Sequence, residues 1–104
     1  MSDAKKKYKI VIHDKAAQMM YTHIRFVANV SIAAASNLKD VFSDAIISLE
    51  DMPGRCPVYP TQYTFGSYRQ LIAGRYKIIF TINEKEKIVQ VKYILDSRQE
   101  TDLL

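Results

Sequence analysis

Basic side chains recur along the carboxyl-terminal third of the chain, within residues 67–99. Those expected on its strands are Arg69, Arg75, Lys77, Lys92 and Arg98. Arginine can form paired hydrogen bonds with phosphate or carboxylate groups, and lysine acts as a point charge. We predict that four of these side chains form an anion-contacting surface on one face of a sheet: Arg69, Arg75, Lys77 and Arg98.

Each of these cations also has a structural alternative. Arg75 and Lys77 alternate with apolar residues, as they would if one sheet face were simply solvated. For Lys92, a position on a solvated sheet face is the favoured interpretation. Asp96 could orient a nearby guanidinium for function, or it could only pair with Arg98.

Groups that could act as acids, bases or ligands are fewer. His13 and His23 both lie in the first quarter of the chain, and we favour a structural or surface role for each. The tyrosines of the strands could stack on bases or transfer protons, but packing is the favoured role; they are Tyr68, Tyr76 and Tyr93. Cys56 is the only cysteine, which excludes an internal disulfide or a cysteine-based metal cluster. No cofactor and no metal are expected.

The basic residues lie on a predicted three-stranded antiparallel meander. Two short connections separate its apolar runs, at Ala73-Gly74 and at residues 83–87, and such links join neighbouring antiparallel strands. In the middle strand one face is wholly apolar and must lie on a core. The residues of that face are Tyr76, Ile78, Phe80 and Ile82.

The upstream half supplies the elements that cover this face. Residues 8–12 predict a strand, and Asp14 is a suitable N-cap for an amphipathic helix that ends near Asn29. Ser31 can cap a second helix, which Pro53-Gly54 ends. The prediction is an α+β fold of order β-α-α-β-β-β, with a helical hairpin packed on one face of a four-stranded, mostly antiparallel sheet.

Length and composition favour one domain. The chain has 104 residues, 48% of them hydrophobic, and we expect a flexible basic leader at 1–7 and a single domain at 8–104. No apolar run is long enough to span a bilayer and no signal peptide is evident, so we expect a cytoplasmic protein with no membrane partner. The net charge of +4 favours acidic or polyanionic partners.

In this order, the segments LEDMPGRCP, YRQLIAGRYKIIFTINE and VQVKYILDSRQ resemble the RelE/ParE toxin superfamily of bacterial type II toxin–antitoxin modules. The matching positions run from Leu49 and Pro53 to the residues of the meander: Arg69, Tyr76, Ile78, Phe80 and Arg98. The resemblance implies a toxin neutralised by a cognate, acidic antitoxin. It also implies catalytic roles for Arg69 and Arg98, and contacts to nucleic acid or target for Arg55, Tyr68, Arg75 and Lys77.

The resemblance leaves the mechanism open between two branches. RelE-like members cleave mRNA on the ribosome, whereas ParE-like members inhibit DNA gyrase without cutting nucleic acid. We expect an action on translation by ribosome-dependent mRNA cleavage; a ParE-like gyrase inhibitor and an inactive, antitoxin-binding relative are the alternatives.

Two departures from the RelE-like pattern weaken a nuclease assignment. The residues after Arg98 contain no tyrosine or histidine, and residues 57–66 contain no lysine or arginine. Metal-free RNA cleavage needs a base, cations and an acid that converge on the phosphate. Whether the chain is an enzyme, a metal-independent endoribonuclease, is therefore not decided by sequence.

Overall fold

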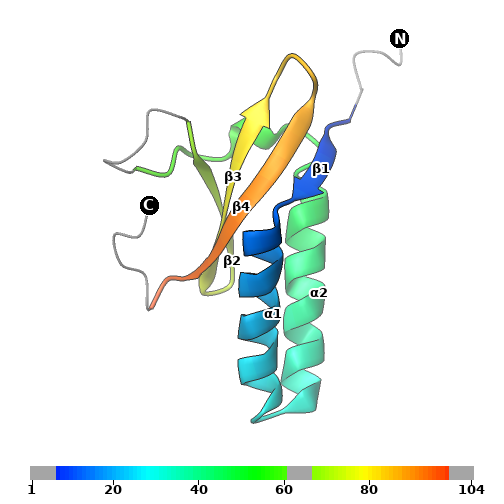
Figure 1. The fold of residues 1–104 in the computed structure, drawn as a ribbon, viewed down its shortest axis with the longest axis vertical. Helices are drawn as coiled ribbons and strands as arrows, with labels where there is room; N and C mark the ends of the chain where they lie inside the picture. Colours follow the sequence, from blue (N-terminus) through cyan, green and yellow to red (C-terminus); the bar gives the residue numbers. More distant parts are fainter. Residues whose placement is uncertain (1–6, 61–66, 99–104) are drawn as a thin grey trace.

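A helical hairpin lies on one face of a four-stranded sheet in the computed structural model, which describes residues 7–60 and 67–98 (Figure 1). In chain order the elements are β1 (Lys9–Ile12), α1 (Asp14–Ala28), α2 (Ile32–Ser48), the 3-10 turn η2 (Pro53–Arg55), β2 (Arg69–Ala73), β3 (Tyr76–Asn83) and β4 (Ile88–Asp96). The predicted α+β fold and its order of elements are confirmed.

The two helices begin with different capping. Ser31 caps α2 as predicted, because its Oγ accepts a hydrogen bond from the backbone N–H of Ala34 at 3.1 Å. The prediction for α1 was wrong by one residue: His13 is the N-cap and makes no side-chain capping bond. Asp14 is instead the first helical residue, where its carboxylate lies near the positive end of the helix dipole.

Helix α2 ends earlier than Pro53-Gly54 predicts, at Ser48 with Leu49 as its C-cap. The chain then turns through Met52, which has a left-handed φ of 49°. Arg55 stabilises this turn because its Nη1 donates to the carbonyl oxygens of Asp51 at 2.7 Å and Met52 at 3.2 Å. A cation beside carbonyl groups at a helix carboxyl end is favourable, so the turn is held by a charge as well as by Pro53.

The strand order is β1-β4-β3-β2. The β2–β3 and β3–β4 pairs are antiparallel, which confirms the meander, and β1 pairs with β4 in parallel. Strand β1 ends at Ile12, opposite Val91, so the last residues of β4 extend past it. This leaves that part of the β4 edge facing α1.

A β-bulge in β4 changes which side chains face the helices. Ile79 pairs with Tyr93 but Phe80 pairs with Val91, so Lys92 is an extra residue. Val89 and Val91 lie in the core under the helices, and beyond the bulge Ile94 takes that side while Leu95 takes the other. The bulge therefore turns Asp96 toward the helix side, where it pairs with Tyr76.

The sheet has an apolar cluster on each face. The main core fills the space between the helices and the sheet, and its fully buried side chains include Phe42, Leu49, Ile78 and Phe80. The opposite face carries a smaller cluster of Tyr59, Ile79 and Leu95, with Tyr68 and Tyr93 packed against it. That face is therefore partly covered by aromatic side chains, rather than being simply solvated between its basic residues.

Several predictions fall outside the described residues. Of the predicted leader only Lys7 is described, and its Nζ lies 3.8 Å from a carboxylate oxygen of Glu50. The predicted connection at 55–66 is described as far as Pro60, and the tail at 99–104 is not described. Within the part of the chain that is described, no helix is long and apolar enough to cross a membrane.

Candidate functional site

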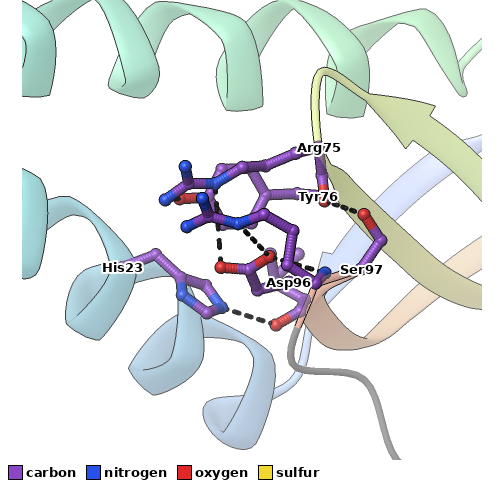
Figure 2. A network of polar contacts seen from close by, with 7 residues as sticks. His23, Arg75, Tyr76, Asp96 and Ser97 are labelled. Carbon is purple, nitrogen blue, oxygen red and sulfur yellow. Dashed lines mark hydrogen bonds and ion pairs between the residues drawn. The ribbon is translucent and has the colours of Figure 1, made fainter.

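A buried carboxylate lies between two arginines at the end of β4. Asp96 is 7% exposed. Its Oδ2 lies 3.7 Å from Nε of Arg75, and its Oδ1 lies 3.7 Å from Nε of Arg98 (Figure 2). The backbone N–H of Arg98 also donates to Oδ1 at 3.0 Å. Asp96 thus pairs with Arg98, as the structural alternative predicted, and it also faces the guanidinium of Arg75.

Backbone geometry fixes this arrangement. Asp96 pairs with Tyr76 as the last residue pair of β3 and β4, and Arg75 precedes Tyr76 at the β2–β3 turn. Immediately after the pair, the backbone N–H of Ser97 donates to the carbonyl oxygen of Arg75 at 2.9 Å, and its hydroxyl donates to the same oxygen at 2.5 Å. The turn and the end of β4 are therefore held together, which brings the two arginines onto one carboxylate.

His23 of α1 lies next to the same cluster, on the side of the helices (Figure 2). Its Nε2 lies 2.9 Å from the carbonyl oxygen of Ile94, on the part of β4 that extends past β1. A carbonyl oxygen can only accept, so Nε2 must carry the proton. The imidazole also lies 4.9 Å from the Tyr76 ring, centroid to centroid, and Phe42 packs edge-on against that ring. His23 thus links α1 to the sheet, as the structural interpretation predicted.

The cluster carries surplus positive charge. Two guanidinium groups share one carboxylate, and Nε of Arg75 is buried without a hydrogen bond in the described structure. Arg75 also donates through Nη2 to the Tyr76 hydroxyl at 3.3 Å. The Arg98 side chain is 60% exposed, so its remaining donors can reach an anion from outside. The arrangement can bind a carboxylate or a phosphate.

Arg69 lies elsewhere and contacts backbone. Its Nη1 donates to the carbonyl oxygens of Cys56 at 2.5 Å and Gly54 at 3.3 Å. It pairs with Phe80, four residues along β3 from Tyr76, which is roughly 13 Å at 3.3 Å per residue. Arg69 and Arg98, the two predicted catalytic residues, therefore do not converge on one point.

The other predicted contact residues are divided between the two ends and the two faces of the sheet. Arg55 belongs to the turn after α2, beside Arg69, and also donates through Nη2 to the Ser48 hydroxyl at 3.1 Å. Lys77 and Tyr68 lie on the face away from the helices. Lys77 Nζ is 5.7 Å from the Tyr59 ring centroid, and Tyr68 packs edge-on against Tyr93. The prediction that Arg69, Arg75, Lys77 and Arg98 share one face of the sheet is thus wrong.

Among the described residues, the structure places His23 and Asp96 in the cluster with Arg75 and Arg98. The only sequence signal for it was the Asp-Ser-Arg tripeptide at 96–98, since His23 is 71 positions from the carbonyl it contacts. Cys56 is buried beside Arg69, and burial raises the pKa of its thiol while the charges of Arg55 and Arg69 oppose that rise. In the described parts of the chain no group of three or more His, Cys, Asp or Glu residues could hold a metal ion.

Comparison with known proteins gives one family and several similar structures. The family described as ParE toxin of type II toxin–antitoxin system, parDE, matches residues 10–101. The fold is similar to a chain of the chromosomal ParDE toxin–antitoxin system from P. aeruginosa, with a TM-score of 0.69, 15% identity, and coverage of 86% of this chain and 95% of that one.

Two further solved structures share the fold. A chain of the RelBE2 toxin–antitoxin complex from Mycobacterium tuberculosis has a TM-score of 0.61 and 13% identity, over 85% of this chain and 88% of that one. A chain of the archaeal RelE–RelB complex from Pyrococcus horikoshii has a TM-score of 0.59 and 16% identity, over 89% and 98%. At such identities the likeness concerns the fold alone. No curated protein matches the chain by sequence.

Proposed function

Because this chain belongs to the ParE toxin family of type II toxin–antitoxin systems, we propose that it inhibits growth by binding DNA gyrase, and that a cognate acidic antitoxin cancels this effect. The resemblance to the RelE/ParE superfamily is confirmed by the family match. Gyrase as target, the cytoplasm as place of action and the acidity of the antitoxin are parts of the proposal.

The separation of Arg69 from Arg98 is the observation that carries inhibition by binding rather than by cutting. Metal-free RNA cleavage needs a base, an acid and cations at one phosphate. Here Arg69 donates to backbone carbonyls, Arg98 shares a carboxylate, and Nε2 of His23 donates to Ile94. Arg69 and His23 are therefore engaged in holding the fold, and the exposed Arg98 lies at a different place from Arg69. Among the described residues this arrangement is better suited to a binding surface than to cleavage at one phosphate.

Charge supports an acidic antitoxin. The chain carries +4 overall, and the cluster of Arg75, Asp96 and Arg98 holds one positive charge in excess on an exposed edge. A carboxylate from a partner would complete the hydrogen bonding of these guanidiniums and would gain the strength of a charge-assisted contact. The similar structures are toxin–antitoxin complexes, which is consistent with such a partner.

The decisive experiment compares two assays on the purified protein. We expect it to inhibit supercoiling by purified gyrase, to leave mRNA intact in a ribosome-containing translation mixture, and to lose its effect when the antitoxin from the adjacent reading frame is added. Unchanged supercoiling together with message cut only in the presence of ribosomes would reject the proposal and establish the mRNA cleavage expected from the sequence. Unchanged growth inhibition on co-expression of the antitoxin would reject the partner.

A further inference from the structure

The charge of one side chain beside the arginines can change near neutral pH, and that side chain is His23. We call Arg75, Asp96 and Arg98 the arginine cluster, which holds one positive charge in excess. Histidine gains or loses its charge between pH 5 and 8, whereas arginine stays charged throughout. The protonation state of His23 therefore decides whether this surface presents one or two surplus positive charges to a partner.

Two sets of contacts connect His23 to the arginine cluster. Its Nε2 donates to the carbonyl oxygen of Ile94 at 2.9 Å, and Asp96 follows two residues later on the same side of β4, which is about 7 Å along a strand. Its ring also lies 4.9 Å from the Tyr76 ring, and the Tyr76 hydroxyl accepts from Nη2 of Arg75 at 3.3 Å. Figure 2 shows the imidazole and the Asp96 carboxylate in the same space between α1 and the end of the sheet.

The second ring nitrogen of His23 can receive a proton. Nε2 already carries one, because it donates to a carbonyl, and among the described residues no group forms a hydrogen bond with Nδ1. A hollow of about 290 Å³ on α1 borders the imidazole, and its other lining residues are Lys15, Gln18, Met19 and Thr22. Solvent in this hollow can supply a proton to Nδ1 while Nε2 keeps its bond to Ile94.

The charged groups on the elements around His23 are mostly cations. Helix α2 contributes Phe42, which packs on the Tyr76 ring, while its charged residues are all exposed: Lys39, Asp40 and Asp44. On α1, Asp14 is nine residues from His23, about 14 Å at 1.5 Å per residue, and Arg25 lies against the Tyr21 ring. The remaining charged groups are Lys15 across the hollow, Lys92 at the bulge, and the three members of the arginine cluster.

A carboxylate bound at the arginine cluster and a proton bound at His23 would attract each other. Opposite charges about 8 Å apart attract by an amount that equals a factor of about two to thirty in affinity, for an effective dielectric constant between those of water and of a protein surface. Coupling between two sites is reciprocal. Binding of the partner therefore favours protonation of His23 as much as protonation favours the partner.

We propose that His23 is a positioning residue of the arginine cluster and that its Nδ1 takes up a proton from solvent when an acidic partner binds there. The toxin then holds its antitoxin more tightly as pH falls from about 8 to about 6. This inference rests on the proposed function, because the antitoxin supplies the carboxylate. A histidine that only held α1 on the sheet would give no such dependence on pH.

The test compares His23→Gln with His13→Gln, which removes the other histidine at the start of α1. Glutamine keeps a side-chain N–H that can donate to Ile94 but stays neutral at every pH. Titration calorimetry with the purified antitoxin, at pH 6 and pH 8 and in two buffers of different ionisation heat, measures affinity and proton uptake. We expect the ratio of the affinities at pH 6 and pH 8 to be at least about threefold larger for the wild type and His13→Gln than for His23→Gln, and only His23→Gln to take up fewer protons.

A second measurement depends neither on the antitoxin nor on the folding of a variant. NMR follows the protonation of both histidines of the wild-type protein in sodium sulfate and in sodium chloride of equal ionic strength, because sulfate is a divalent anion that guanidinium groups can bind. Sulfate should increase the protonated fraction of His23 at a given pH and leave His13 unchanged.

Two results would overturn the inference. One is an equal dependence of antitoxin affinity on pH in the wild type and in folded His23→Gln, and the other is an equal protonation of His23 in the two salts. An antitoxin that binds at neither pH would reject the proposed partner, and the sulfate measurement would still decide whether His23 responds to an anion at the arginine cluster.

Discussion

Two pairs of arginines in this protein have opposite environments. Arg55 and Arg69 lie where α2 ends, and their guanidiniums donate to the backbone carbonyls of residues 48–56. Arg75 and Arg98 lie at the other end of the sheet and share the single carboxylate of Asp96. An arginine is therefore available to a partner only when the fold has not already used its donors.

The largest difference should appear in stability. Arg69→Ala should lower the free energy of unfolding by about 2 kcal/mol, because a charged hydrogen bond contributes roughly 1.5–3 kcal/mol and the Cys56 carbonyl would lose its donor. Arg98→Ala should cost less than about 1 kcal/mol, because its ion pair is mostly exposed and Arg75 still faces Asp96. Urea unfolding of both variants measures this. Equal losses of unfolding free energy in the two variants would show that the fold depends on both arginines to the same extent.

The second prediction concerns binding of the antitoxin. Arg98→Ala should weaken it about tenfold, equivalent to ~1.4 kcal/mol, because the variant leaves Arg75 and Asp96 as a neutral pair and removes the surplus charge. The loss should shrink as salt is added. Titration calorimetry with the purified antitoxin measures the affinity. Arg55→Ala is the control, since Arg55 is also exposed but lies at the other end of the sheet; an equal loss there would contradict the assignment.

The smallest effect concerns the buried thiol of Cys56, which lies near Arg55 and Arg69. Burial raises the pKa of Cys56 in the folded state, so at alkaline pH the unfolded state loses its proton first. The contribution of this thiol to stability is therefore complete below the pKa of the unfolded thiol, about 8.5, and is lost as pH rises through the folded value. The unfolding free energies of the wild type and of Cys56→Ala should be compared from neutral to alkaline pH. They should converge, or cross, above the pKa of the folded thiol. Parallel curves would contradict the prediction.

Local sequence determined the elements of this fold. Apolar periodicity, the Ser31 cap and the short links of the meander act within a few residues, and they correctly predicted the helical hairpin, the three antiparallel strands and a covering of helices on one face. The ends of elements were less well determined. Helix α2 stops at Ser48 because its carboxyl end meets Arg55 and the turn at Met52, which an apolar stripe cannot reveal.

The candidate site depended on long-range geometry. Simple alternation along β4 would continue the core face of Val89 and Val91 through Tyr93 and Leu95, but the extra residue Lys92 turns Asp96 inward instead. His23 became part of the cluster only because β1 is too short to cover the end of β4. The residue pattern alone therefore accounts for the α+β fold and the net positive charge. Which arginines pair with a carboxylate and which donate to backbone depends on the tertiary structure, because strand register and a single bulge set the face on which each side chain lies.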